Sequence, residues 1–302
     1  MKLIDDLNER FRVKSANFDL GNGGLPRLSI HGRTAEAELY LQGAQLTRWR
    51  PHGHAPVLWL SDRAMFKPDA AIRGGIPVCW PWFGPKPGEA TAKAHGFART
   101  ATWTMHNVEL LPDSSINAVL TLTDHDVPAV NSVWRNAFSL TLDITIGESL
   151  TLALTTKNIG RASFDITEAL HTYLEVGDIR RASITGLDGV AYVDQLAGGA
   201  RTTQVETDIH FTAETDRIYA TESSCQLRDP VLKRRIHVSK AGSGSTVVWN
   251  PWIEKTARLA DMNASSWQSM VCVEAANSSD ARVHLAPGQS HTLMTRLDVH
   301  VL

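Results

Sequence analysis

The chain has 302 residues, of which 43% are hydrophobic and 21% are charged, and both fractions are typical of soluble globular proteins. This composition excludes the disordered, fibrous and disulfide-rich classes. The formal net charge is -2 and the isoelectric point is near 6.6, so the chain has no strong field for a nucleic acid or an anionic membrane. The most basic stretch, Lys233-Arg234-Arg235, is expected in a solvated loop or at a strand edge. We therefore expect neither nucleic acid nor a membrane as a partner.

Cysteine use and the first residues indicate the compartment. Cys79, Cys225 and Cys272 cannot all pair, and none belongs to the closely spaced pairs of a structural zinc site. The first ten residues include acidic side chains where a signal peptide needs a basic segment followed by an apolar one. No apolar run approaches the ~20 residues of a membrane-spanning helix. The expected location is cytoplasmic, with reduced thiols.

In chain order, the first predicted element is a short amphipathic helix over residues 1–11, because apolar residues from Leu3 to Phe11 recur at helical spacing. The apolar period then changes to two. The clearest case is residues 138–154, where two alternating runs flank a Gly-Glu turn and predict a hairpin with one buried face. Alternation or β-branched enrichment predicts further strands in residues 37–46, 116–124, 245–250, 269–277 and 291–302.

Many short strands and almost no helix indicate an all-β, antiparallel protein. No linker or break in composition divides the chain, and strand signals run through its whole length. We therefore expect residues 1–302 to form a single domain, a large antiparallel β-sandwich.

Residues 71–103 interrupt the strand pattern, because this segment is dense in Gly, Pro and aromatic residues. Its prolines lack amide donors and cannot lie in a central strand, so a long, ordered, functional loop is predicted. Arg73 precedes a Gly-Gly pair, and His95 and Arg99 lie in the run HGFAR. Two guanidinium groups on one glycine-containing loop favour an anion site such as a phosphate site, although each could also form a structural ion pair.

The same loop is rich in aromatic residues. Trp80, Trp82, Phe83 and Trp103 suit either the apolar face of a sugar ring or the protein core. The sequence alone leaves both roles open.

Three further residues are candidates for the site. His171 lies in a β-enriched run with Tyr173 on the same face, where a structural role is the common one. Glu274 ends the apolar run MVCV, where a carboxylate must be paired, hold a raised pKa or leave the core. Asp216 precedes a strand-like segment and also fits a turn residue.

Other kinds of site are not supported by the sequence. His52 and His54 lie on a Pro/Gly loop without a third ligand nearby, so they do not indicate a metal site. The chain has no P-loop, dinucleotide fingerprint or nucleophile elbow. We expect no metal and no cofactor.

Several motifs together resemble those of the hexose-6-phosphate mutarotases, a branch of the aldose 1-epimerase superfamily. They are AIRGGIPVCWPWFG, AHGFARTATW, ALHTYLEVGDI, TDRIY, VVWNPW and MVCVEAAN, in family order from about residue 71 to 277. The resemblance implies a galactose-mutarotase-like β-sandwich with the sugar in an open cleft. The expected activity is the interconversion of α and β anomers of a hexose 6-phosphate, most simply glucose 6-phosphate.

The resemblance also implies roles for individual residues. His171 matches the general acid of the family and Glu274 the general base. Arg73, His95 and Arg99 match residues that line the sugar and phosphate site, and Asp216 matches an acidic residue that contacts sugar hydroxyls. Lys86 or Lys93 could also contact the phosphate.

Opening a pyranose requires a base at the anomeric hydroxyl and an acid at the ring oxygen. Glu274 would remove the first proton and His171 would donate the second, and these roles would reverse on ring closure. An unperturbed histidine is mostly neutral at pH 7, so its surroundings must keep it protonated or easily protonated. We expect a nearby Glu274 to favour the imidazolium.

Other functions also fit parts of the pattern. A carbohydrate-binding β-sandwich needs the aromatic residues but not the acid-base pair. A glycoside hydrolase or lyase usually needs two catalytic carboxylates, of which only Glu274 stands out. A mutarotase of free aldoses would not depend on Arg73 and Arg99. The preferred hexose and the oligomeric state are left open.

Overall fold

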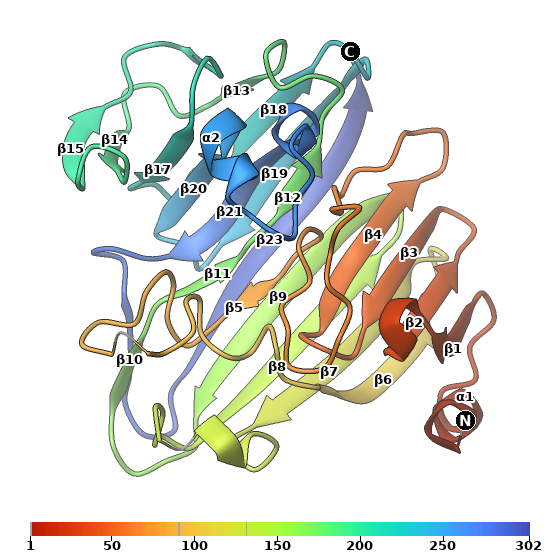
Figure 1. Cartoon of the computed structure of the whole chain (residues 1–302). Coiled ribbons are helices and arrows are strands. Elements are labelled where there is room, and N and C mark those ends of the chain that lie inside the picture. Colours follow the sequence, from red (N-terminus) through yellow and green to blue (C-terminus); the bar gives the residue numbers. More distant parts are fainter. Residues whose placement is uncertain (1, 90, 131) are drawn as a thin grey trace.

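The computed structural model describes residues 2–89, 91–130 and 132–302, and strands predominate within them (Figure 1). Met1 of the predicted helix and Ala90 of the predicted loop lie outside these residues. Ladders within the two large sheets are antiparallel, which confirms the predicted all-β class. In the described part of the chain, no helix is long and apolar enough to cross a membrane.

One large sheet has nine strands. Its order is β16 (Asp208–His210), β13 (Ser183–Thr185), β18 (Cys225–Asp229), β19 (Arg234–Ala241), β23 (Ser290–Val301), β9 (Ser149–Asn158), β8 (Phe138–Ile146), β7 (Ile116–Thr123) and β6 (Thr104–Leu110).

The other large sheet has eight strands. Its order is β15 (Ala200–Thr203), β14 (Ala191–Asp194), β17 (Thr215–Tyr219), β20 (Ser245–Asn250), β21 (Met270–Asn277), β11 (Glu168–Leu170) and β5 (Val78–Cys79), and β12 (Tyr173–Glu175) also pairs with β21.

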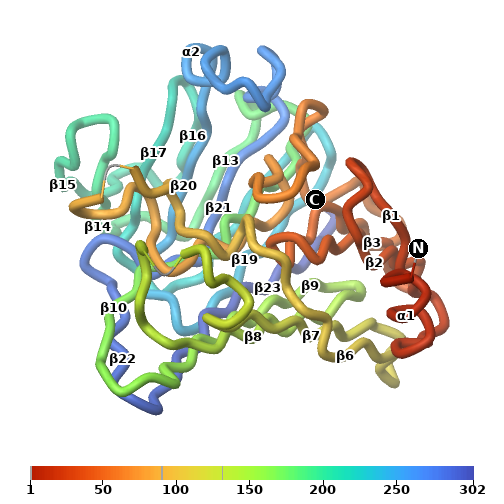
Figure 2. Tube along the Cα trace, turned by 60° about the horizontal axis from the view of Figure 1, so that its bottom comes forward, coloured from red at the N-terminus to blue at the C-terminus, as the bar shows by residue number. Residues whose placement is uncertain are grey.

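Smaller elements flank these sheets. A four-stranded sheet has the order β1 (Ala16–Leu20), β2 (Pro26–His31), β3 (Ala35–Tyr40) and β4 (Gln45–Pro51), and β10 (Phe164–Ile166) pairs with β22 (Val283–Leu285). The α-helices are α1 (Lys2–Arg10) and α2 (Trp252–Ala257), and the short 3-10 helices are Asn22–Gly24, Pro128–Val130 and Ser266–Ser269. The N-terminal elements α1 and β1 lie at the opposite side of the molecule from β14 and β15 (Figure 2).

The predicted hairpin of residues 138–154 is confirmed as β8 and β9. Ile146 pairs with Leu150 across the turn, and in both strands buried residues, most of them apolar, alternate with less buried residues, most of them polar. This alternation buries one face of the hairpin, because successive side chains in a strand point to opposite sides. The other predicted strands are also present, except that the single strand predicted over residues 37–46 is divided: it comprises the end of β3, a turn over residues 41–44 and the start of β4.

The two large sheets pack face to face. β23 of the nine-stranded sheet contacts β11 and β21 of the eight-stranded sheet. A continuous cluster of buried apolar residues, which extends in sequence from Phe11 to Leu297, fills the space between them. This arrangement is the predicted β-sandwich, in which each sheet buries one face against the other.

The predicted N-terminal helix forms, and one side of it packs on the four-stranded sheet. Ile4 and Leu7 contact the main core and Phe11 is buried. Leu3, predicted on the same face, is 54% exposed. The helix therefore uses a narrower apolar stripe than the sequence suggested.

The expectation that Lys233-Arg234-Arg235 is simply solvated is wrong for its middle residue. Arg234 is 1% exposed and donates hydrogen bonds to the backbone carbonyls of Ala55 (2.9 Å) and Glu175 (2.7 Å). A planar guanidinium can satisfy several buried carbonyls at once, so this basic residue joins three separated segments.

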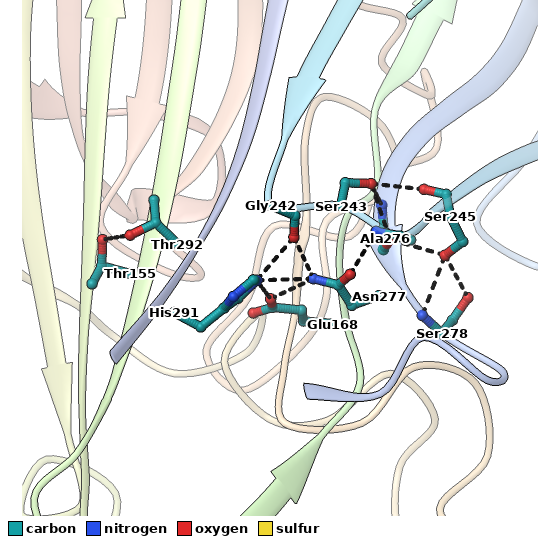
Figure 3. Close-up of polar contacts among 11 residues, drawn as sticks. Thr155, Glu168, Gly242, Ser243, Ser245, Ala276, Asn277, Ser278, His291 and Thr292 are labelled. Atoms are coloured by element: carbon teal, nitrogen blue, oxygen red, sulfur yellow. Dashed lines mark hydrogen bonds and ion pairs between the residues drawn. The ribbon is translucent and has the colours of Figure 1, made fainter. Parts of the chain in front are cut away.

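A cluster of polar residues on β11, β21 and β23 links the eight-stranded sheet to the nine-stranded sheet (Figure 3). Glu168, which is fully buried, accepts a hydrogen bond from Asn277 Nδ2 at 3.1 Å, and its Oε1 lies 3.3 Å from His291 Nε2. Both Asn277 and His291 also contact the backbone carbonyl of Gly242. The cluster thereby joins β11, β21 and β23 to the turn that leads into β20.

Candidate active site

The side chains of β21 divide between two faces of the eight-stranded sheet. Val271 and Val273 point into the core between the sheets, whereas Cys272 and Ala276 belong to a second apolar cluster on the opposite face. Glu274 has the same strand parity as Cys272, so its carboxylate points to that second face. There it is 1% exposed.

The register of the sheet brings His171 opposite Glu274. Leu170 of β11 pairs with Ala275, and Tyr173 of β12 pairs with Cys272. These two pairings share one register, so His171 lies opposite Glu274 and on the same face. The side chains meet, with His171 Nδ1 and Glu274 Oε1 3.4 Å apart. Directly opposed residues in a sheet are the closest side-chain neighbours across strands.

Both side chains line a cavity of about 720 Å³ on this face. Arg73, His95 and Asp216 line the same cavity. Five of the six residues singled out in the sequence, from four separated segments, therefore meet at one place. A concave pocket with a few convergent polar groups is the usual form of a small-molecule site.

His171 lies among aromatic rings. Its imidazole stacks on Tyr173 with 4.8 Å between ring centroids, and the Trp249 ring stands nearly perpendicular to it at 6.1 Å. Burial lowers the pKa of His171 well below its usual value, and the positive charges of Arg99 and Arg73 act in the same direction. The imidazole is therefore neutral in the free protein at pH 7.

Burial has the opposite effect on Glu274. It raises the pKa of this carboxyl well above its usual value, and the negative charge of Asp216 adds to the effect. The expectation that Glu274 holds His171 as an imidazolium does not fit these surroundings, because removal from water disfavours both charged forms. In the free protein the proton is favoured on the Glu274 carboxyl.

Arg73 is anchored at the cavity wall by two contacts. Its Nε lies 3.0 Å from Asp261 Oδ2, and its Nη1 donates to the Tyr173 hydroxyl at 2.9 Å. Among the described residues its Nη2 has no protein hydrogen-bond partner. Since Tyr173 stacks on His171, the guanidinium lies one side chain away from the candidate acid.

His95 is held by the backbone of the predicted loop. Its Nδ1 accepts a hydrogen bond from the Gly84 amide at 3.3 Å, which leaves the Nε2 proton as a donor. Burial, with help from Arg99 and Arg73, lowers its pKa to about 3. His95 is therefore a neutral hydrogen-bonding group beside His171, whose ring centroid is 5.7 Å away.

Asp216 lines the cavity from β17. Burial raises its pKa to about 6, although Lys255 acts against this. Lys255 Nζ lies 3.8 Å from Asp216 and 3.0 Å from Glu214. This lysine also lines the cavity and was not identified from the sequence.

The remaining basic candidates occupy different positions. Arg99 does not line the cavity, and its Nη2 donates to the Ala94 carbonyl at 2.8 Å. Its charge nevertheless acts on His95, His171 and Glu274. Lys86 lines the cavity, whereas Lys93 does not and contacts the Asp69 carbonyl.

The loop aromatic residues divide between the two roles that the sequence left open. Trp82 and Phe83 line the cavity, while Trp80 and Trp103 are buried in the core. Trp249 lines the cavity as well and was missed as a site residue. Its place follows from the ladder, in which it pairs directly with Asp216, and that pairing is not visible in the sequence.

Residues 27–298 match the family described as aldose 1-epimerase. The match covers most of the chain. The chain belongs to the aldose 1-epimerase family. The five cavity residues Arg73, His95, His171, Asp216 and Glu274 all lie within the matched range.

Individual relatives agree with this assignment. A protein of Cenchrus ciliaris is 34% identical over 88% of this chain and 82% of its own length. A protein of Escherichia coli K12 is 34% identical over 82% of this chain and 81% of its own length. Both are provisionally named glucose-6-phosphate 1-epimerase. This epimerase chain is also similar to the crystal structure of a provisionally assigned mutarotase from Salmonella typhimurium, with a TM-score of 0.88 and 28% identity over 95% and 94% of the two chains.

A more distant structure supports the fold of this family member. A galactose mutarotase-like protein of Clostridium acetobutylicum superposes with a TM-score of 0.72 at 12% identity, over 95% of this chain and 98% of its own. The predicted galactose-mutarotase-like sandwich is thereby confirmed.

Proposed function

We propose that this protein interconverts the α and β anomers of hexose 6-phosphates, with glucose 6-phosphate as the first substrate to test. The observation that carries the proposal is the direct opposition of His171 and Glu274, 3.4 Å apart in a sugar-sized cavity. The names of the relatives from Cenchrus ciliaris and Escherichia coli support the same reaction.

In the proposed reaction, Glu274 accepts the proton of the anomeric hydroxyl while His171 donates a proton to the ring oxygen, and the ring opens. Rotation about the bond between the first two carbons presents the other face of the aldehyde. Ring closure then runs with the proton transfers reversed. No electrons leave the substrate, and the pair returns to its starting protonation state.

The neutral resting pair already holds the proton that this reaction needs. A neutral His171 with a protonated Glu274 and an imidazolium with a carboxylate carry the same number of protons. The two forms differ by one transfer over 3.4 Å. Polar substrate groups in the cavity favour the charged form, so the reactive pair arises without a proton from solvent.

Arg73 is proposed to bind the phosphate. The phosphate of a hexose 6-phosphate is attached next to the carbon that bears the ring oxygen, so it must lie close to the acid that protonates that oxygen. Arg73 meets this requirement, because it contacts Tyr173 and Tyr173 stacks on His171. Lys86 and Arg282 line the same cavity and are proposed to add to the positive field.

The other polar groups are proposed to orient the sugar. His95 offers its Nε2 proton to a sugar oxygen, Asp216 accepts hydrogen bonds from sugar hydroxyls beside β17, and Trp249 supports the apolar face of the ring. Arg99 is proposed to act at a distance, through its charge on the acid-base pair and its support of the loop.

The decisive experiment is anomer exchange measured by exchange NMR on glucose and glucose 6-phosphate side by side. Glu274→Gln and His171→Asn should each lower the rate by roughly 10²- to 10⁴-fold, the usual contribution of an acid or base. His106→Asn, at an exposed position of β6, is the matched control and should keep the full rate.

Arg73→Ala tests the substrate class. It should raise the KM for glucose 6-phosphate strongly and change turnover of free glucose little, while Arg63→Ala, at an exposed position outside the cavity, should change neither. Equal rates on both sugars would instead indicate a free-aldose mutarotase. Binding of sugar without acceleration would indicate a carbohydrate-binding protein.

A further inference from the structure

Cys272 is a buried thiol that the proposed reaction does not use. It lies two residues from Glu274 on β21, on the same face, and pairs across the ladder with Tyr173. One donor atom each from His171, Cys272 and Glu274 lie within 4.8 Å of one another, and all three residues are buried. Imidazole, thiolate and carboxylate are the three side-chain ligand types of zinc sites.

Two polar atoms of this cluster have no partner. His171 Nδ1 and Glu274 Oε2 are buried without a hydrogen bond to any residue that the structure describes. Their side chains are 9% and 1% exposed. Buried polar atoms without partners are costly, so a ligand that satisfies both is favoured here.

We propose that His171, Cys272 and Glu274 form a binding site for Zn²⁺, and that this ion blocks the acid-base pair. Nitrogen and sulfur donors select a transition metal such as zinc over Mg²⁺ or Ca²⁺. Ligand atoms around tetrahedral zinc lie about 3.5 Å apart, a separation that His171 Nδ1 and Glu274 Oε1 already have at 3.4 Å. The donor atoms of all three residues lie within 4.8 Å of one another, so movements of about 1 Å bring them to this separation.

Charge and coordination are both compatible with the ion. Binding forms Zn–N, Zn–O and Zn–S bonds, and the protons of the thiol and the carboxyl pass to solvent without any change of oxidation state. The thiolate and carboxylate then neutralise the ion, while the neighbouring charge of Arg73 is balanced by Asp261 at 3.0 Å. His171 and Glu274 line the cavity, so the fourth position of the metal opens toward it.

The functional consequence rests on the proposed function. Zinc occupies the lone pair of His171 and the oxygens of Glu274 that would transfer protons, so anomerisation and metal binding exclude each other. The metal is therefore an inhibitor and not a cofactor, in keeping with a reaction that needs no metal.

The first test uses the metal alone and does not depend on activity. The whole protein, treated with chelator and dialysed, is titrated with Co²⁺ as a spectroscopic substitute for Zn²⁺. We expect a thiolate-to-cobalt charge-transfer band in the near ultraviolet that Zn²⁺ removes. The band should be absent in Cys272→Ala and retained in Cys225→Ala, a variant of a buried thiol on β18 outside the cavity.

The second test measures glucose 6-phosphate anomer exchange against added Zn²⁺ in chelator-free buffer. Zinc should abolish exchange in the wild type and in Cys225→Ala. Cys272→Ala, checked for folding by thermal unfolding, should require at least ~10-fold more zinc for half-inhibition, because one ligand is lost. Equal zinc sensitivity of Cys272→Ala, or a cobalt band that survives in it, would overturn the proposal. A cobalt band in a protein without anomerase activity would refute the proposed function but support the metal site.

Discussion

At the scale of single residues, burial acts in opposite senses on His171 and Glu274. It lowers the pKa of the imidazole and raises the pKa of the carboxyl, so both shifts favour the neutral imidazole and the protonated carboxyl. In the free protein the pair then holds one transferable proton, on the carboxyl. Two groups this close titrate as a unit, and their apparent pKa values belong to the pair.

These opposite shifts predict a broad pH profile for anomerisation. The imidazole gains a proton only well below pH 6.5, and the carboxyl loses its proton only well above pH 4.5. We therefore expect kcat for glucose 6-phosphate to have a plateau through neutrality, with an acid limb below the ordinary histidine pKa and an alkaline limb far above the ordinary glutamate pKa. Exchange NMR at saturating substrate from about pH 4 to about pH 10 measures it. A single rise centred near the ordinary histidine pKa would contradict the lowered pKa of His171.

Gly96, next to His95, carries a second prediction at this scale. Its φ is 71°, and an added Cβ would lie 1.9 Å from the Trp80 carbonyl oxygen. Gly96→Ala should lower the free energy of unfolding by more than about 3 kcal/mol, because the strain of the left-handed conformation adds to a backbone clash. It should also slow anomerisation, since the loop that holds His95 must move.

The matched control is Gly53→Ala, whose position has a φ of 82° and no atom within 4 Å of the added Cβ. Conformation alone should cost this variant about 1–2 kcal/mol. Urea denaturation of both variants measures the difference. Equal losses would mean that the loop absorbs the clash without cost.

At the scale of elements, local patterns and long-range pairing differ in how well the sequence reveals them. The β8–β9 hairpin is predictable, because alternation and a turn lie within one short stretch. The pairing of β11 and β12 with β21 is not, since the strands are about a hundred residues apart and β21 is buried on both faces. Without that register nothing in the sequence places His171 opposite Glu274, and Trp249 cannot be assigned to the cavity. Family motifs pointed to the pair, and the ladder provides the physical reason.

The polar cluster behind the site makes an element-scale prediction for stability. The hydrogen bond with Glu168 is the main cause that raises the pKa of His291 above 6.5. A raised folded-state pKa gives stability that is fully present below the unfolded pKa and is lost as the pH rises through the folded value. His291→Asn should therefore lose more stability relative to wild type at about pH 6 than at about pH 9.

Urea unfolding at the two pH values measures this effect. His284→Asn is the control, because His284 pairs with Asp165 at 2.7 Å with both side chains largely exposed, and such pairs contribute little. The same pH-dependent loss in both variants would show that the buried cluster does not couple β11, β21 and β23.

At the scale of the whole molecule, the site is assembled from segments spread over most of the chain. The cavity takes Arg73 and His95 from the long loop, His171 from the end of β11, Asp216 from β17 and Glu274 from β21. The site geometry therefore depends on the pairing of distant strands in the eight-stranded sheet and on the loop that packs beside them. No fragment that lacks part of residues 73–274 contains all five of these residues.

The single domain predicted for residues 1–302 is tested by cooperativity. The main core extends from Phe11 to Leu297, and Trp49 of the four-stranded sheet donates a hydrogen bond to the Gly147 carbonyl in the β8–β9 turn at 3.1 Å. We expect one urea transition with coincident midpoints by far-ultraviolet circular dichroism and by tryptophan fluorescence.

Trp49→Phe should lower the free energy of unfolding by about 2 kcal/mol, through lost packing and the lost hydrogen bond, and should move both midpoints together. Leu110→Ala, at an exposed position, should shift neither. If Trp49→Phe separated the two transitions, the N-terminal sheet would unfold independently and the chain would hold two folding units.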